Sequence, residues 1–136
     1  MAESQNHMDL VKIAYNFITS LVPENKKSLI QYDSPTTSRP TKVIGGFIPD
    51  VFFWTGDLLV IGEAKTLKDF DNKHSKKQIE SYYKECAKFY GESFLVISVP
   101  WQLVFSVKNY IRSIRHGIPG TVSVVVINEL GWRDEI

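Results

Sequence analysis

The chain is poor in cysteine and has no excess of charge of either sign. Its single cysteine, Cys86, excludes an intramolecular disulfide and suits a reducing compartment. Nearby Tyr82, Tyr83 and Phe89 suggest a buried core thiol rather than a nucleophile. The 16 basic and 15 acidic residues give a net charge of +1, so overall charge predicts neither a nucleic-acid-binding protein nor an acidic substrate. Any electrostatic attraction to a partner must be local.

Long hydrophobic runs and targeting segments are also missing from the sequence. We therefore expect a cytoplasmic protein with no membrane partner. The three histidines lack the spacing of a zinc site, and Gly45-Gly46 precedes a strand rather than a helix, which argues against an ATP-binding loop. With 136 residues, 43% of them hydrophobic, the chain suits one domain with a core, predicted over residues 1–136.

The order of the hydrophobic patterns predicts an α/β fold. Apolar residues at helical spacing predict a first helix that ends before Pro23, and two later helices at 76–90 and 101–116. Several continuous apolar strands indicate a mixed central sheet flanked by helices, in the order αβββαβαβ, with residues 66–73 as a polar connection. The strands are expected at 29–32, 48–54, 58–65, 93–99 and 121–127.

The second and third of these strands are predicted to form a hairpin. We expect Gly56-Asp57 to be a two-residue loop, with Gly56 supplying the positive φ of a type II′ turn. Counting back from this loop places Asp50 opposite Glu63. Side chains alternate along a strand, so Lys65 points to the same face as Glu63. Two facing carboxylates repel each other, which suggests that a cation lies between them.

This group of charges suits metal-assisted chemistry on phosphate. A hard cation such as Mg²⁺ needs only one or two protein carboxylates, and a nearby ammonium can orient water or neutralise developing charge. The alternative is an ordinary ion pair in which Lys65 neutralises one acid at the edge of the sheet. The two strands are otherwise apolar, and charged residues are costly there without a reason.

The segments Ile48-Pro49-Asp50 and Gly62-Glu63-Ala64-Lys65, with the later Gln78, resemble the PD-(D/E)xK nuclease superfamily. Within it they are most similar to VRR-NUC domains and archaeal-type Holliday junction resolvases. The resemblance implies a restriction-endonuclease-like core and a Mg²⁺-dependent endodeoxyribonuclease, with Mn²⁺ able to substitute. It also implies metal binding by Asp50, Glu63 and the Ala64 carbonyl, a catalytic role for Lys65 and support from Gln78.

Two further positions have competing interpretations. In this family an acidic residue on the first helix often completes the site, and Asp9 is the nearest equivalent, with Glu24 as a further candidate. Asp9 equally suits a first-turn acid after an Asn6 cap. Ser75 to Gln78 also reads as a capping box, in which the glutamine side chain returns to the helix start.

Basic residues near the motif are candidate contacts to a nucleic-acid backbone. Counterion release makes such residues useful, although charge runs are commonly just solvated faces. A second basic stripe, Lys108, Arg112 and Arg115, has helical spacing and suits either phosphate binding or a plain solvent face. The candidate backbone contacts are Arg39, Lys42, Lys68, Lys73, Lys76 and Lys77.

The sequence leaves the substrate and the assembly open. We expect DNA cleavage, but RNA stays open because a contact to the 2′-hydroxyl leaves no readable motif. The alternative function is a non-catalytic or partner-dependent nuclease-fold subunit that binds nucleic acid within a larger assembly. A chain of this size has little surface beyond its core to select a substrate, so a homodimer or a partner protein fits either function.

Overall fold

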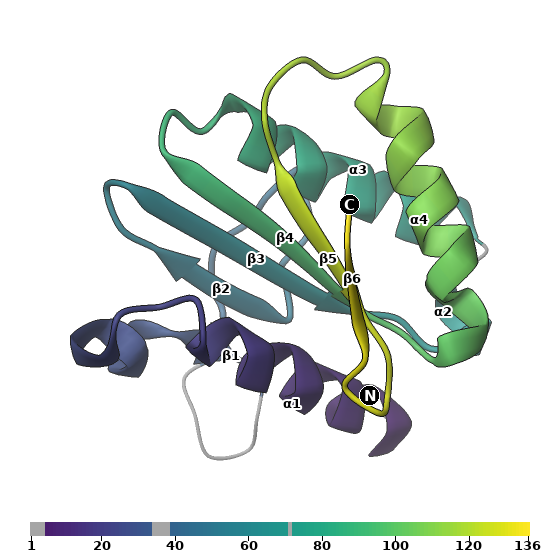
Figure 1. The fold of residues 1–136 in the computed structure, drawn as a ribbon, viewed down its shortest axis with the longest axis horizontal. Helices are drawn as coiled ribbons and strands as arrows, with labels where there is room; N and C mark the ends of the chain where they lie inside the picture. Colours follow the sequence, from purple (N-terminus) through teal and green to yellow (C-terminus); the bar gives the residue numbers. More distant parts are fainter. Residues whose placement is uncertain (1–4, 34–38, 71) are drawn as a thin grey trace.

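Six strands form one mixed sheet in this computed structural model, which describes residues 5–33, 39–70 and 72–136 (Figure 1). The strands lie in the sheet in sequence order. The middle strands β3, β4 and β5 run parallel, and the other neighbouring pairs are antiparallel. The predicted α/β class and mixed sheet are therefore confirmed. The strands are β1 Gln31–Tyr32, β2 Val51–Trp54, β3 Leu58–Ala64, β4 Glu92–Ser98, β5 Ser123–Ile127 and β6 Arg133–Glu135.

The helical segments are α1 Gln5–Thr19, the 3-10 helix η1 Glu24–Leu29, α2 Leu67–Phe70, α3 Lys73–Lys88 and α4 Trp101–Arg115. α1 covers one face of the sheet, and α3 and α4 cover the other (Figure 1). Cys86 on α3 is buried, as predicted. Among the described residues, no helix has the length and apolar character needed to cross a bilayer.

Alternation along β3 decides which face carries the charged motif. Val60 and Ala64 pack in the cluster under α1, whereas Leu59 and Ile61 pack in the cluster under α3 and α4. Glu63 shares the parity of Ile61, so it points toward α3. One face of the sheet therefore carries the apolar layer under α1, and the opposite face, under α3 and α4, carries Glu63.

The observed element order differs from the predicted αβββαβαβ. The first predicted strand is reduced to two residues because Leu29 belongs to η1, and the predicted polar connection contains α2, held by the buried side chain of Phe70. Beyond the last predicted strand, Gly131 adopts a φ of 84° and lets the chain turn back as β6. α3 begins at Lys73, three residues before the predicted start.

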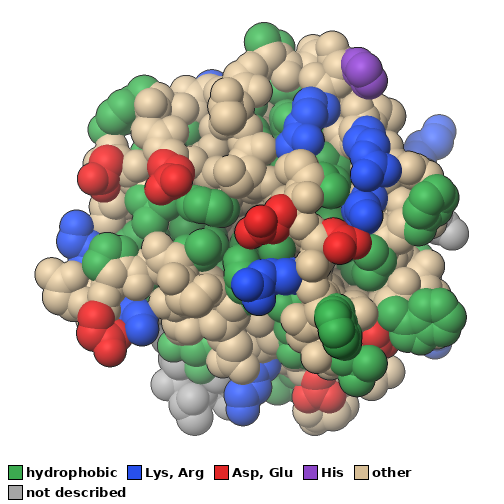
Figure 2. Space-filling view, in the orientation of Figure 1, with side chains coloured by type: hydrophobic (Ala, Val, Ile, Leu, Met, Phe, Trp, Pro, Cys, Tyr) green, Lys and Arg blue, Asp and Glu red, His purple; other side chains and the backbone are tan. Residues whose placement is uncertain are grey.

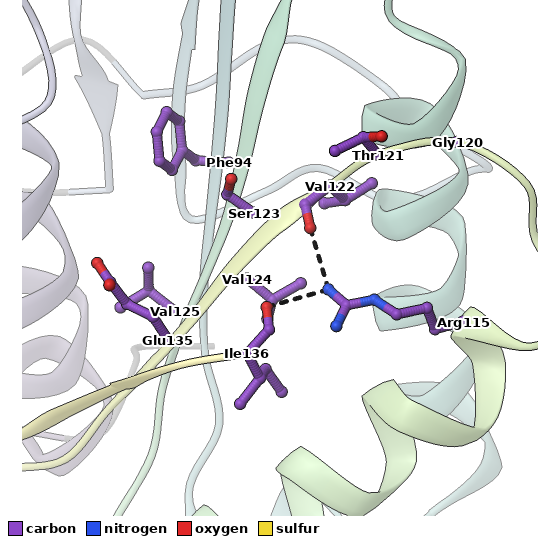
Figure 3. Close-up of a pocket in the computed structure, with 10 residues that line it drawn as sticks. All are labelled: Phe94, Arg115, Gly120, Thr121, Val122, Ser123, Val124, Val125, Glu135 and Ile136. Carbon is purple, nitrogen blue, oxygen red and sulfur yellow. Dashed lines mark hydrogen bonds between the residues drawn. The ribbon is translucent and has the colours of Figure 1, made fainter.

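Arg115 connects this unpredicted end of the chain to the core. Its guanidinium donates hydrogen bonds to the Tyr83 hydroxyl at 3.0 Å and to the carbonyls of Val122 at 3.0 Å and Ile136 at 3.1 Å. The last two bonds cross a pocket at the start of β5 (Figure 3). Arg115 therefore holds the end of the chain against the core, and Lys108 of the same predicted stripe pairs with Asp134 at 2.9 Å.

The hairpin register was predicted correctly, but the turn type was wrong. Trp54 pairs with Leu59, and the Thr55 N–H donates to the Leu58 carbonyl at 2.9 Å, as a two-residue loop requires. Gly56 does not adopt a positive φ, so the turn is not type II′. The Thr55 hydroxyl instead donates to the Asp57 carboxylate at 2.9 Å, which holds the loop from within.

Gly62 permits the close approach of α1 to the hairpin. A Cβ atom at this position would lie 2.9 Å from Ile18 Cδ1 and 2.9 Å from Val51 Cβ. We expect Gly62→Ala to lower the free energy of unfolding by about 1–3 kcal/mol, because overpacking forces the neighbours to shift. Urea denaturation measures this. Gly56→Ala is the matched control, since a Cβ there would lie 3.6 Å from its nearest neighbour, the Tyr90 hydroxyl, and an equal loss in both variants would contradict the expectation.

Candidate active site

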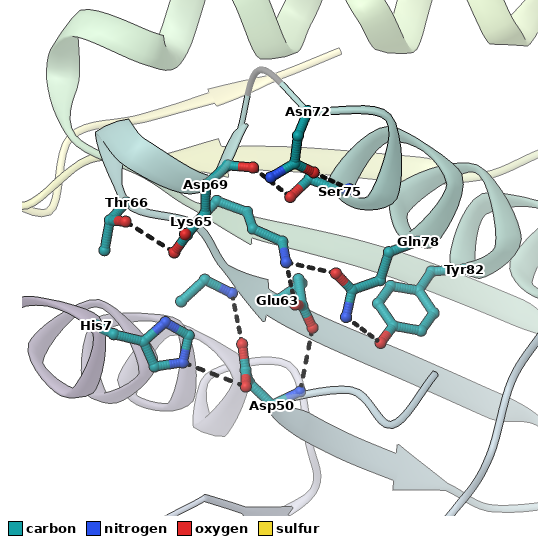
Figure 4. Close-up of polar contacts among 11 residues, drawn as sticks. His7, Asp50, Glu63, Lys65, Thr66, Asp69, Asn72, Ser75, Gln78 and Tyr82 are labelled. Atoms are coloured by element: carbon teal, nitrogen blue, oxygen red, sulfur yellow. Dashed lines mark hydrogen bonds and ion pairs between the residues drawn. The ribbon is translucent and has the colours of Figure 1, made fainter. Parts of the chain in front are cut away.

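The structure brings together four residues that the sequence singled out, from three separate segments (Figure 4). Glu63 and Lys65 lie at the carboxyl end of β3, Asp50 directly precedes β2, and Gln78 projects from α3. The pairing of Val51 with Gly62 continues in register to place Asp50 beside Glu63. The site therefore lies at the carboxyl edge of the parallel strands, where open α/β sheets commonly bind ligands.

Asp50 is fixed by the backbone of the neighbouring strand. Its Oδ2 accepts a hydrogen bond from the Ala64 N–H at 2.9 Å, and its own N–H donates to Glu63 Oε1 at 3.3 Å. The N–H and C=O of a residue in an extended strand point to the same edge, so the Ala64 carbonyl opens toward Asp50. His7 of α1 approaches from the other side, with Nε2 3.4 Å from Asp50 Oδ1.

A chain of polar side chains positions Lys65. Its Nζ lies 3.2 Å from Glu63 Oε2 and donates to Gln78 Oε1, and Gln78 Nε2 lies within 3.2 Å of the Tyr82 hydroxyl. The capping-box interpretation of Gln78 is wrong, because the true cap is Asn72, whose side chain accepts from the Ser75 N–H at 2.7 Å. Gln78 is free of that role and orients the lysine.

Burial makes the acidic pair electrostatically costly. Glu63 is only 2% exposed. Its pKa is raised well above the ordinary value of 4.5, first by burial and next by the charge of Asp50, while Lys65 acts in the opposite direction. Burial and the charge of Glu63 also raise the pKa of Tyr82, which keeps its hydroxyl protonated. One ammonium thus faces two carboxylates and neutralises them incompletely.

The donor set fits a hard divalent cation. Within the described residues no group of three His, Cys, Asp or Glu side chains forms a closed metal cage. Two carboxylates with a backbone carbonyl are nevertheless sufficient for Mg²⁺, which keeps several waters and avoids all-protein cages. Burial and the nearby Asp50 both disfavour the charged form of Glu63 and raise its pKa, and a bound cation would favour that charged form. Asp50, Glu63 and the Ala64 carbonyl would hold it.

α1 contributes His7 to the site, a residue that sequence reasoning missed. Asp9 is exposed and accepts a hydrogen bond from the Gln5 side chain at 2.9 Å. It lines a pocket of about 600 Å³ together with Lys68. His7 instead lies on the buried face of α1, in helical register with Val11. That spacing was the available signal, because a polar residue within an apolar stripe needs a partner in the core.

Neither Asp9 nor Glu24 has the role that the sequence suggested for it. Asn6 lies within α1 and does not cap it, so the proposed first-turn role of Asp9 after that cap is wrong. Glu24 is in η1, where its carboxylate pairs with Lys27 at 2.8 Å.

The candidate backbone contacts fall into two groups. Arg39 pairs with Asp33 at 3.2 Å, Lys76 lies over the Tyr110 ring at 5.9 Å, and Lys42 lines a pocket beside Trp54. These three are committed to other contacts or lie toward the hairpin loop. The remaining three lysines, which are exposed on α2 and at the start of α3, are Lys68, Lys73 and Lys77.

No protein-family model, curated protein or solved structure matches the chain. Functional inference therefore depends on the converged side chains and on the chemistry that they allow. Two acids at one sheet edge with a positioned lysine suit hydrolysis of a phosphodiester, which needs charge stabilisation and a directed water. A structural ion pair alone would require one acid, not two.

Replacing the buried acid should stabilise the metal-free protein. We expect Glu63→Gln to raise the free energy of unfolding by about 1 kcal/mol or more at pH 8. The folded protein holds a proton on Glu63 at pH values where the unfolded chain has lost it, so wild-type stability falls as pH rises above about 4.5. The variant lacks this loss. Below that pH both states of the wild type are protonated and the difference should disappear.

Thermal unfolding in EDTA across pH measures the effect. Glu92→Gln removes an exposed carboxylate from β4 and serves as the control. A Glu63→Gln protein that is less stable than wild type at pH 8 would show that the Lys65 ion pair outweighs burial and repulsion.

Proposed function

We propose that this protein is a Mg²⁺-dependent endonuclease that hydrolyses DNA phosphodiester bonds on a restriction-endonuclease-like core. The observation that carries the proposal is the convergence of Asp50, Glu63, Lys65 and Gln78 on one sheet edge. Their order and residue types are those of the PD-(D/E)xK motif. Support also comes from the closeness of Asp50 to the buried Glu63, whose pKa is raised first by burial and then by Asp50, because a bound cation would offset both effects.

Each side chain has a distinct task in this mechanism. Asp50, Glu63 and the Ala64 carbonyl would hold Mg²⁺, which would supply Lewis acidity toward a phosphoryl oxygen and lower the pKa of a bound water. The Lys65 ammonium directs a water toward phosphorus and offsets negative charge that develops on the phosphoryl oxygens. Gln78 holds the Lys65 ammonium in place through Oε1, and His7 orients the Asp50 carboxylate. These preset contacts limit reorganisation during reaction.

Exposed lysines supply the local attraction that the net charge of +1 does not. Lys68 on α2 and Lys73 and Lys77 on α3 follow the motif directly in sequence and remain accessible. Phosphate contacts of this kind position a substrate without reading its sequence. The substrate is therefore a nucleic-acid backbone that passes over the start of α3.

Removing the lysine should abolish cutting while leaving the fold intact. We expect Lys65→Ala to lower the cleavage rate by about 10²-fold or more, because the ammonium acts on charge that develops during reaction. Labelled duplex, single strand, flap, four-way junction and RNA are incubated with Mg²⁺, Mn²⁺ or EDTA. Lys88→Ala, which removes an exposed lysine from the far end of α3, is the matched control.

The outcome of this panel separates the candidate functions. Equal cleavage rates for wild type and Lys65→Ala would contradict the assignment of Lys65 and its neighbours as the active site. Cutting confined to RNA would correct the substrate. Metal binding without cutting of any substrate would favour the partner-dependent subunit.

Backbone contact predicts a change in salt dependence. The logarithm of the affinity for duplex DNA falls linearly with the logarithm of salt concentration, with a slope near 0.9 per neutralised phosphate. We expect Lys73→Ala with Lys77→Ala to reduce this slope by about 1 per lysine. Fluorescence anisotropy in the Lys65→Ala background measures binding without cleavage. Lys88→Ala again serves as control, and an unchanged slope would remove these lysines from the interface.

A further inference from the structure

Large aromatic side chains are exposed along α4 and beside β6. Trp101 is 63% exposed, Phe105 70% and Trp132 75%. Figure 2 shows hydrophobic side chains gathered over α4 and the neighbouring β6, next to basic and acidic groups. Contiguous exposed apolar surface of this kind marks an interaction site on soluble proteins. We call α4 residues 101, 105, 108 and 112, together with Trp132 and the following strand β6, the β6 surface.

The helix and the strand form one continuous surface. Lys108 Nζ lies 2.9 Å from Asp134 Oδ2, which connects the exposed side of α4 to β6. Trp101, Phe105, Lys108 and Arg112 follow one another at intervals of four, three and four residues, so they line one side of the helix. Trp132 shares the parity of Asp134 and hence faces the same side of the sheet as α4.

β6 is an edge strand with a defined set of outward backbone groups. Hydrogen bonds join Asn128 to Trp132 at 2.9 Å and Ile136 to Val124 at 2.9 Å. In an antiparallel ladder bonded and non-bonded pairs alternate, so the N–H and C=O groups of Arg133 and Glu135 point away from β5. Among the described strands none pairs with that outer side. The edge is therefore a template for another strand.

We propose that the β6 surface binds a second copy of this chain through antiparallel pairing of the two β6 strands around Asp134. The outward backbone groups of Arg133 would then exchange hydrogen bonds with those of Glu135 of the second copy, and the reverse. This register also sets each arginine opposite a glutamate, and opposite charges across a strand pair are stabilising. The edge is thus complementary to itself in both backbone geometry and charge.

Antiparallel pairing of two identical β6 strands creates a two-fold axis at Asp134, and this axis also makes the two α4 helices complementary. It is perpendicular to the sheet, so both α4 helices lie on one face and run antiparallel beside the axis. Because Lys108 lies next to Asp134, the aromatic half of one α4 meets the basic half of the other. Phe105 would then lie near Arg112 of the second copy, an arrangement that suits a cation–π contact. Asp134 faces its own copy across the axis, and Lys108 on each chain offsets that repulsion.

This dimer does not depend on the proposed nuclease activity. It would join two six-stranded sheets into one continuous sheet and cover the most exposed aromatic residues of α4. The two candidate sites would lie at opposite ends of that sheet, because pairing is antiparallel.

Charge reversal tests the register directly. Arg133→Glu places two glutamates on the edge of each chain and Glu135→Arg places two arginines there, so each variant alone should associate more weakly than wild type. A mixture of the two restores both opposite-charge pairs and should form a species of twice the 15.6 kDa chain mass. Sedimentation velocity of wild type, each variant and the mixture measures this. We expect each single reversal to weaken association about tenfold or more.

Two controls accompany these variants. Arg133 lies over the Phe17 ring at 5.1 Å, so circular dichroism checks that its replacement leaves the fold intact. Phe105→Ser should weaken the dimer about tenfold, as expected for a central aromatic contact, whereas Trp54→Ser removes an exposed aromatic from β2 and should not.

Several results would overturn the proposal. They are a wild type that stays monomeric at high concentration, a dimer that survives both charge reversals, and a mixture that does not associate. A monomer whose tryptophan fluorescence is quenched by an oligonucleotide, with quenching lost in Phe105→Ser, would assign the surface to nucleic acid instead.

Discussion

The repulsion between two neighbouring carboxylates at the end of a buried strand pair is the interaction on which the organisation of this site depends. Glu63 lies in the apolar layer under α3, where burial and Asp50 both disfavour its charge. The Lys65 ammonium offsets this repulsion in part, and it is held by Gln78, which in turn contacts Tyr82. Removing Lys65 alone would leave the acids without their counter-charge and cost stability, whereas replacing Glu63 relieves burial and repulsion, so the buried pair itself is weak evidence of stability. A functional reason for keeping two acids there is therefore the more economical explanation.

The fold keeps this arrangement in place through packing on both faces of the sheet. Gly62, next to Glu63, lets α1 approach β3 closely, and that approach carries His7 to Asp50. On the other face, Asn72 caps α3, and Gln78 in the second turn of this helix faces Lys65. The site is thus built on strands and helices rather than on loops, which favours fixed geometry.

Local pattern was a reliable guide wherever one face of an element had to be buried. The hairpin register followed from a two-residue loop, and a one-residue slip would have turned every apolar side chain to the wrong face. The turn type was not predictable in this way, because the Thr55 to Asp57 bond competes with the preference of glycine for positive φ. The predicted start of α3 was three residues too late because Ser75 and Gln78 match the capping-box pattern, whereas the observed cap is Asn72.

The sequence by itself determined the α/β class, the parity that puts Asp50, Glu63 and Lys65 on one face, and the residue types that suit phosphodiester hydrolysis. These follow from short periodicities that any chain segment carries alone. Only the tertiary structure decided that His7 and not Asp9 reaches Asp50, that Arg115 binds the carbonyls of Val122 and Ile136, and that β6 forms an edge of the sheet. Such contacts join segments far apart in the chain, and their partners depend on the angles at which whole elements pack.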